Sequence, residues 1–327
     1  MKVLFIGGTG TISTAVSELA VQNGVDLYLL NRGTSNTLIN GANSAIADIN
    51  DLEAVRAVID GHHFDAIVNW IVFTPEQIAR DIDLFTGKCN QYIFISSASA
   101  YQKPLTHPII TESTPLSNPY WEYSRNKIAC EERLMRAYRE DGFPVTIIRP
   151  SHTYDRNIPA AIGNGNSYVI AKRILEGKPV IAHGDGSSLW TLTHSADFAK
   201  GFLGIVGNPQ AIGHAIHITS DYLLTWNQIY EQIGDALGVA PHIVHIPSDF
   251  IAEKNPDLGA GLLGDKMWSV IFDNRKIKRF VPDYAATIPF HIGIRRALAW
   301  FQSEDERMQV KPEDDVLIDS ILDAYHS

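Results

Sequence analysis

The chain has 327 residues, with 27 lysines and arginines against 37 aspartates and glutamates, so its formal net charge is −10 at pH 7. This length suffices for one large α/β domain or for two lobes. The acidic balance disfavours a nucleic-acid or membrane surface, because both partners are anionic. Cys89 and Cys130 are too few for a disulfide framework, and the apolar run at the N-terminus is too short for a membrane span. We therefore expect a cytoplasmic protein without nucleic-acid or membrane partners.

The N-terminus has the pattern of a buried strand, a glycine turn and a helix. The strand KVLFI runs straight into GGTGTIS, after which apolar residues recur every three or four positions. In this context glycines let the backbone approach a pyrophosphate at the helix N-terminus. The spacing is Gly7-x-x-Gly10-x-x-Ser13, with a small serine where a third glycine would help the helix to pack on the strand. We expect Gly7, Gly10, Thr11 and Ile12 to bind a dinucleotide, the alternative being a glycine turn without a ligand.

The ends of the next two strands indicate which dinucleotide binds. A strand at 25–30 ends in Asn31 and Arg32, whereas NAD sites usually place an acid there and NADP sites use an arginine for the 2′-phosphate. The sequence therefore favours NADP over NAD, unless Arg32 is simply a solvated loop charge. Asp48, at the end of a short third strand, is placed to accept a hydrogen bond from the adenine amine.

Strands and helices then alternate, which predicts a parallel sheet with helical crossovers. Ligands of such sheets collect at the carboxyl ends of the strands. Asn69 lies near the end of the apolar run 64–72, and Ser97 and Ser99 follow the strand at 91–95. We expect Asn69 to contact the cofactor. The predicted fold is a Rossmann-type doubly wound α/β sheet over residues 1–165, with a smaller substrate lobe over 166–327 from which some segments return to the sheet.

A helix predicted at 119–138 carries Tyr123 and Lys127 one turn apart. Residues four apart lie on one helical face. A neighbouring ammonium stabilises a phenolate and lowers the pKa of the phenol from its usual value of about 10, which favours proton transfer near neutral pH. The alternative is a packed ring beside a solvated charge. The pair therefore acquires meaning only together with a cofactor site and a third catalytic group.

The glycine loop, Ser97 in ISSASAY and Tyr123-x-x-x-Lys127, in this order, resemble the extended short-chain dehydrogenase/reductase family, in its NAD-dependent epimerase/dehydratase group. The likeness continues through an Arg-Pro stretch at 149–150, a Gly-Asp-Gly stretch at 184–186 and an Asp-x-x-Lys stretch at 273–276. It implies that Tyr123 is the general acid/base and that Lys127 holds the nicotinamide ribose and lowers the pKa of Tyr123. It also implies that Ser97 binds the substrate oxygen.

The resemblance further implies a homodimer formed through the Tyr123 helix and its neighbour, which the apolar residues Ile128, Leu134 and Met135 would permit.

Several positions depart from this family pattern. Trp190 stands where nucleotide-sugar members have an arginine for the diphosphate, and a tryptophan cannot make that contact. His152 replaces an asparagine near the substrate, and Ala98 and Ser99 replace an Asp-Glu pair, so dehydration is disfavoured. Ordinary nucleotide-sugar epimerisation is thereby in doubt, although Arg156, Arg275 or Arg279 could contact a phosphate.

We expect Ser99, His152, Trp190 and Arg275 to contact the substrate. The aromatic residues Trp121, Tyr154 and Trp190 suit a ring-bearing substrate of low charge, or equally form packing at its rim.

The sequence therefore predicts an NAD(P)-dependent oxidoreductase or epimerase that acts on a hydroxyl or keto carbon of a small molecule by hydride transfer, a sugar nucleotide epimerase being the narrower version. The alternative is a non-catalytic dinucleotide-sensing or RNA-associated regulator of the same superfamily. Residues 254–267, rich in glycine, suggest a mobile loop that could form a lid. No metal site is expected, because the pairs His214/His217 and His242/His245 lie in strand-like runs that place them on opposite faces.

Overall fold

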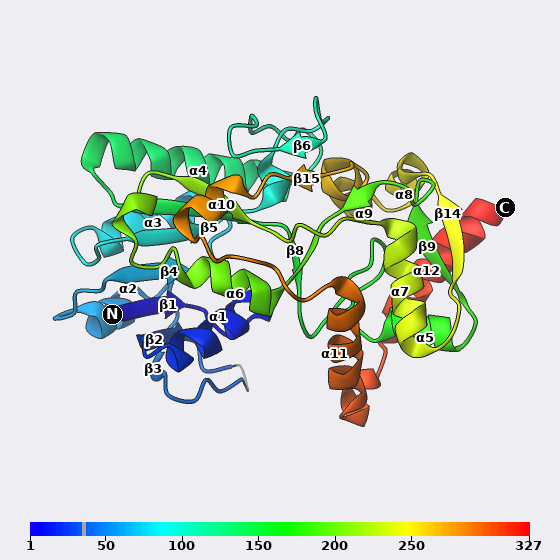
Figure 1. Cartoon of the computed structure of the whole chain (residues 1–327), viewed down its shortest axis with the longest axis horizontal. Coiled ribbons are helices and arrows are strands. Elements are labelled where there is room, and N and C mark those ends of the chain that lie inside the picture. Colours follow the sequence, from blue (N-terminus) through cyan, green and yellow to red (C-terminus); the bar gives the residue numbers. More distant parts are fainter. Residues whose placement is uncertain (35–36) are drawn as a thin grey trace.

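The N-terminal body is built around a parallel sheet of seven strands, in a computed structural model that describes residues 1–34 and 37–327. The strand order is β12-β7-β5-β4-β1-β2-β3. This is the Rossmann-type doubly wound sheet that the sequence predicts (Figure 1). The strands are β1 (Lys2–Ile6), β2 (Asp26–Asn31), β3 (Asn43–Ile46), β4 (Ala66–Asn69), β5 (Tyr92–Ile95), β7 (Val145–Pro150) and β12 (Ala215–Ile218).

Helices cover both faces of this sheet, which explains why its strands are apolar on both sides. In β1, Val3 and Phe5 pack into one core and Leu4 and Ile6 into the other. The first core also holds residues of α1 (Thr11–Gln22), α6 (Ser195–Leu203) and α10 (Arg275–Phe280). The second core holds residues of α2 (Leu52–Ile59), α3 (Pro75–Phe85) and α4 (Glu122–Asp141).

The strand order reverses at β1, which pairs with β2 on one side and β4 on the other. Crevices at such a switch point, at the carboxyl ends of the strands, are where open α/β sheets bind ligands. The glycine loop after β1, Asn31 at the end of β2 and the serines after β5 all meet at this edge.

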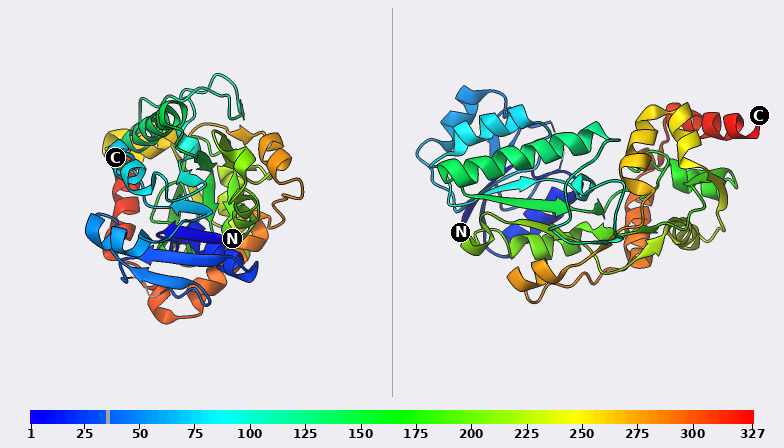
Figure 2. Two further views of the ribbon diagram at one scale, coloured as in Figure 1. Left: turned by 90° about the vertical axis from the view of Figure 1, so that its left-hand side faces the viewer. Right: turned by 90° about the horizontal axis from the view of Figure 1, so that it is seen from above.

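The second body is a mostly helical lobe, which lies beside the sheet along the long axis of the molecule (Figure 2). Its helices enclose a separate apolar core around the β9–β14 pair. Although they follow the first part of the lobe in sequence, α6 and β12 return to the N-terminal body. The elements of the lobe are α5 (Val169–Leu175), β9 (Pro179–His183), α7 (Trp226–Leu237), β14 (His242–Ile246), α8 (Ser248–Lys254), α9 (Pro256–Gly261), α11 (Phe290–Gln302) and α12 (Pro312–His326).

Short elements complete the chain, several of them in pairs of segments that are far apart in sequence. The paired strands are β6 (Ile109–Ile110) with β15 (Ile271–Phe272), β8 (His152–Tyr154) with β11 (Leu192–His194) and β10 (Leu189–Trp190) with β13 (Leu224–Thr225). Single helical turns are η1 (Ala98–Ala100), η2 (Pro209–Ala211) and η4 (Asp305–Met308), and η3 (Leu262–Lys266) is a π-helix. Among the described residues, no helix is both long and apolar enough to span a membrane.

The segment 254–267, expected to be a mobile loop, is instead helical in α9 and η3. Asn255 caps α9 by accepting a hydrogen bond from the backbone N–H of Leu258 at 3.0 Å. The glycines serve close packing: a Cβ on Gly259 would lie 2.4 Å from the Cβ of Ala252, and one on Gly264 2.7 Å from the Cβ of Trp121. The glycine content therefore indicated tight contacts, and we do not retain a lid.

Candidate active site

Two hollows meet at Tyr123. The first is a groove of about 740 Å³ along the carboxyl edge of the sheet, and the second is a cavity of about 440 Å³ lined by residues of both bodies. Tyr123 and Pro150 line both hollows, so the phenol stands where they join. We call them the groove and the cavity below.

The glycine loop forms one end of the groove. Gly7 and Gly8 have φ angles of +90° and +104°, and a Cβ on Gly8 would lie 2.8 Å from Cδ2 of Leu29. The Ser17 hydroxyl donates to the Gly8 carbonyl at 2.8 Å and fixes the loop against α1. Ser13, expected only to be a small substitute for glycine, also accepts a hydrogen bond from the Gly10 N–H at 2.9 Å.

This loop fits a dinucleotide, because the side-chain-free backbone and the N-terminus of α1, which begins at Thr11, together form a cradle for a pyrophosphate. Gly7, Gly10, Thr11 and Ile12 all line the groove, as expected of cofactor-binding residues.

The far end of the groove carries Asn31, Arg32 and Asp48. The Asn31 amide is placed to donate to the Gly7 carbonyl at 2.7 Å, which ties the end of β2 to the glycine loop. Asp48 accepts from the N–H and the side-chain amide of Asn50 at 2.9 and 3.0 Å. Arg32 is exposed, and no carboxylate replaces it at the end of β2.

Asn69 does not line the groove, which differs from the prediction. Its side chain is fully buried, donates to the Asp81 carboxylate at 2.5 Å and accepts from the N–H of Ile71 at 3.0 Å. Burial raises the pKa of Asp81, which also accepts from the Tyr92 hydroxyl at 2.6 Å. The position at a strand end was right, but this buried acid on α3 turns the amide inward.

Tyr123 and Lys127 lie one turn apart on α4 and both border the groove. The Lys127 ammonium donates to the carbonyls of Val72 at 2.5 Å and Ile95 at 2.8 Å, and lies 5.7 Å from the centroid of the Tyr123 ring. Burial lowers the pKa of Lys127 to about 8.

Burial also raises the pKa of Tyr123, which a hydrogen bond with Ser97 opposes and the Asp265 carboxylate reinforces. The predicted lowering of the phenol pKa by Lys127 is therefore not seen, because burial of the phenol is the largest influence on this pKa.

Three hydroxyls prepare the Ser97 side of the site. The Ser124 hydroxyl donates to that of Ser99 at 2.7 Å, and the hydroxyls of Ser99 and Ser97 are 2.9 Å apart. Ser97 and Ser99 both line the cavity beside Tyr123. Ser97 is therefore oriented by a short chain of hydroxyls toward the point where a substrate oxygen would approach the phenol.

His152 and Trp190 line the cavity together. The Trp190 indole N–H donates to Nδ1 of His152 at 3.2 Å, so the imidazole proton resides on Nε2. Burial lowers the pKa of His152 to about 3, and the Lys266 charge contributes. The imidazole is therefore a neutral donor of fixed tautomer, in line with the expectation that this pair faces a substrate.

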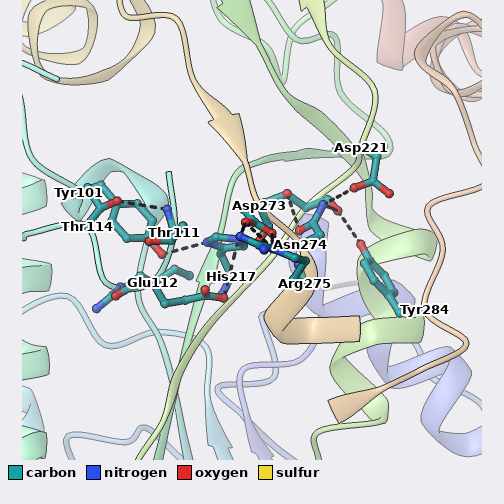
Figure 3. Close-up of polar contacts among 12 residues, drawn as sticks. Tyr101, Thr111, Glu112, Thr114, His217, Asp221, Asp273, Asn274, Arg275 and Tyr284 are labelled. Carbon is teal, nitrogen blue, oxygen red and sulfur yellow. Dashed lines mark hydrogen bonds and ion pairs between the residues drawn. The ribbon is translucent and has the colours of Figure 1, made fainter. Parts of the chain in front are cut away.

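Arg275 lies outside both hollows, which differs from the prediction of a substrate contact. Its guanidinium is 80% exposed and pairs with Asp273, two residues away (Figure 3). The Asp273 carbonyl accepts from the buried His217, which also contacts the Tyr101 hydroxyl at 3.0 Å. The Asp-x-x-Lys stretch therefore packs this segment onto β12.

Asp265 and Lys266, both on η3, line the cavity and were not singled out from the sequence. An Asp-Lys pair after a glycine-rich stretch is also typical of a solvated loop, so the sequence held no signal for them. Within the described part of the chain, no group of three or more His, Cys, Asp or Glu side chains is arranged to hold a metal ion.

Comparison with known proteins agrees with this geometry. The sequence model of the NAD dependent epimerase/dehydratase family matches residues 3–219. The chain belongs to this family. Its members include NAD-dependent epimerases, dehydratases and reductases, so the chain is a member of an enzyme family whose cofactor the groove fits.

Three relatives show the breadth of the family. The chain is 23% identical over 287 residues to the 2′-dehydrokanamycin reductase of Streptomyces kanamyceticus, covering 87% of this chain and 80% of the relative. It is 25% identical over 267 residues to the chloroplast stem-loop binding protein of 41 kDa b of Arabidopsis thaliana, covering 76% and 67%. The dTDP-glucose 4,6-dehydratase of Bacillus anthracis, solved in complex with NAD, superposes with a TM-score of 0.73 at 18% identity, covering 94% and 98%. This last likeness establishes the fold alone.

Proposed function

We propose that this protein is an NAD(P)-dependent oxidoreductase or epimerase that acts on a hydroxyl or keto carbon of a small, ring-bearing molecule held in the cavity. The observation that carries the proposal is the position of Tyr123, which lines both the groove and the cavity with Ser97 beside it. A group that moves a proton must reach the substrate while the hydride donor or acceptor lies on the other side, and this position meets both requirements.

In this scheme the nicotinamide, when bound, supplies or accepts the hydride. Tyr123 gives a proton to the substrate oxygen or takes one from it, and Ser97 donates a hydrogen bond to the same oxygen. Because burial raises the pKa of Tyr123, the phenol is protonated near neutral pH and suits the protonation of a carbonyl oxygen, as in a reduction. Lys127 borders the groove and would hold the ribose of the cofactor.

The wall of the cavity favours a substrate that presents rings and hydroxyls. Trp121, Trp190 and Phe272 supply apolar faces, and His152 supplies a neutral donor. A relative named as a reductase of 2′-dehydrokanamycin supports a keto-bearing ring as the substrate. The narrower proposal of a sugar nucleotide epimerase lacks the arginine that Trp190 replaces, and so ranks second.

The variant Tyr123→Phe tests the proposal. We expect it to reduce turnover by about 10²- to 10⁴-fold, the usual contribution of a general acid/base, while cofactor affinity stays within about twofold. Turnover is measured at 340 nm over a panel of sugar nucleotides and keto sugars. The matched control Tyr120→Phe removes a hydroxyl from a ring that is 39% exposed and outside the cavity. Turnover that survives in Tyr123→Phe would refute the assigned role.

Arg32 is the basis for proposing NADP over NAD. An arginine bound to the 2′-phosphate should favour NADPH by about tenfold or more, the value of one charge-assisted hydrogen bond. Fluorescence titrations with NADPH and NADH measure this ratio. Arg32→Ala should abolish it, whereas Arg56→Ala, at an exposed position on α2, should not. A clear preference of the unmodified protein for NADH would overturn the proposal.

The second candidate function is RNA association, and the stem-loop binding relative is the observation that favours it. The net charge of −10 counts against it. An electrophoretic shift with stem-loop RNA that persists at physiological salt would support this function. Loss of the shift between 50 and about 150 mM salt would exclude it as a specific activity.

The proposed homodimer rests on the outer face of α4, and one residue expected there is elsewhere. Leu134 is fully buried in the core beneath α4, whereas Ile128 and Met135 are partly exposed. An interface on this face would therefore be largely polar, since Arg125, Glu132 and Arg136 are exposed beside them. Light scattering decides between one and two copies.

A further inference from the structure

The π-helix η3 carries two charged residues to the wall of the cavity. Asp265 and Lys266 occupy its last two positions, and both line the cavity. π-helices are rare and are found frequently at functional sites, where the extra residue redirects side chains. The feature therefore invites the question of what these two side chains bind.

The backbone of η3 is held firmly by neighbours from both bodies. The Lys266 carbonyl accepts two hydrogen bonds, from Nε1 of Trp226 at 3.1 Å and from Nε2 of His183 at 3.0 Å. The side-chain amide of Asn118 donates to the Gly264 carbonyl at 2.7 Å and to the Ser99 carbonyl at 2.9 Å. This arrangement links η3 to the serine chain beside Tyr123, so the two charges are held in place relative to the phenol.

Neither charged group has a close partner in the part of the chain that the structure describes. Among the described residues, the Asp265 carboxylate and the Lys266 ammonium have no hydrogen bond or ion pair, although both are partly buried in a wall of aromatic, aliphatic and hydroxyl side chains. Burial raises the pKa of Asp265 and lowers that of Lys266. Charged groups in such surroundings are costly unless a partner compensates them, and a bound substrate would be that partner.

The surroundings indicate the sign of the compensating charge. Lys103, only 2% exposed, lies behind the wall with its ammonium unbonded, and its positive charge acts on Asp265. The charges of both Lys103 and Lys266 act on Asp265, and the formal charge of these three groups is positive when all are ionised. The Lys266 ammonium lies 5.6 Å from the centroid of the Trp121 ring, at the cavity side.

We propose that Lys266 binds an anionic group, a carboxylate or a phosphate, on a polyhydroxylated ring substrate. The hydroxyls of this substrate would donate hydrogen bonds to the Asp265 carboxylate. The rings of Trp121 and Trp190 would pack on the faces of this substrate. Lys266 thereby supplies, from a different element, a positive charge that Trp190 cannot supply. The proposal rests on the proposed function, because it names the substrate class of the same cavity.

Calorimetric titration of the NADP⁺-saturated protein tests the proposal without turnover. The probes are inorganic phosphate, D-glucuronate, D-glucose and D-glucosamine, of which the first two separate a phosphate from a carboxylate preference. We expect at least one anion to bind about tenfold or more tightly than glucose, the value of one charge-assisted hydrogen bond. Lys266→Met should abolish this difference, Lys266→Arg should retain it, and the control Lys254→Met, on the surface beside Glu253, should not change it.

The variant Asp265→Asn supplies an independent measurement, because it should raise the affinity for an anion where Lys266→Met should lower it. Removal of this negative charge should tighten phosphate binding several-fold, about as expected for a like charge removed from a partly buried site. Tighter binding of glucosamine than of either anion, anion binding unchanged in Lys266→Met, or no binding of any anion would each overturn the proposal. Tyr123→Phe separates the two proposals: it should leave anion binding intact even while it abolishes turnover.

Discussion

The groove and the cavity, which meet at Tyr123, are built in different ways. The wall of the groove consists largely of segments that directly follow strands β1, β2, β3 and β4. The wall of the cavity is made of aromatic, aliphatic, hydroxyl and charged side chains, most of them from segments 97–99, 121–123, 150–152, 158–160, 190–191 and 265–272. The cofactor side is therefore set by the sheet itself, whereas the chemistry of the substrate side depends on side chains that distant segments bring together.

The largest effect should come from Glu131, which lies on the helix that carries Tyr123. Its carboxylate, on α4, accepts two hydrogen bonds from Arg149 on β7, one of them at 2.5 Å, and one from Ser96 at 2.5 Å. Both partners of this ion pair are almost fully buried. Glu131→Gln leaves the arginine charge uncompensated and should lower the free energy of unfolding by about 3–5 kcal/mol.

Urea denaturation measures this loss. The neighbouring exposed variant Glu132→Gln should change stability by less than about 0.5 kcal/mol. Equal stabilities of the two variants would show that the pair does not hold α4 against the sheet.

A smaller effect, confined to the groove, is expected for Gly8→Ala. The new methyl would meet Leu29 at 2.8 Å at a φ of +104°, so we expect a loss of about 2–3 kcal/mol and weaker NADPH binding. Gly24→Ala is the matched control, because its φ is +74° but nothing lies within 4 Å of the added methyl. It should cost only about 1 kcal/mol and leave cofactor affinity unchanged. If both variants bound NADPH as the unmodified protein does, the close approach at Gly8 would have no role in the groove.

The smallest of these effects concerns the cavity and depends on pH. Burial lowers the pKa of His183 to about 4, although the hydrogen bond that its Nε2 donates to the Lys266 carbonyl opposes this shift. The buried Nδ1 has no partner among the described residues. Below pH 6.5 the unfolded chain takes up a proton that the folded chain refuses until about pH 4, so stability falls as the pH falls through this window. Between pH 7 and pH 5 the loss should be about 2 kcal/mol from this residue.

Chemical denaturation at the two pH values measures the loss, and His183→Gln, which keeps a side-chain donor, should be less sensitive to pH by this amount. An equal loss in the variant would contradict the buried neutral imidazole.

The sheet, the glycine loop and the Tyr123 helix could be predicted from the local sequence pattern, because each depends on hydrophobic periodicity and turn residues within a short stretch. This pattern also placed Asn69 at the correct strand end, but it did not reveal where the side chains of Asn69 and Arg275 would turn. Their side chains went elsewhere because of partners that no short-range pattern reveals: the buried Asp81 for Asn69, and Asp273 for Arg275. Lys127 shows the same limit, since the two carbonyls that bind its ammonium belong to the segment after β4 and to β5.

Because Tyr123 and Pro150 each form part of both linings, the occupants proposed for the groove and the cavity would share these two residues as neighbours. Any shift of these residues that improves the fit of one occupant alters the fit of the other. If the dinucleotide changes the affinity for the second ligand by some factor, thermodynamic linkage requires that the second ligand changes the affinity for the dinucleotide by the same factor. Ligand screens carried out on the cofactor-free chain would therefore miss this contribution.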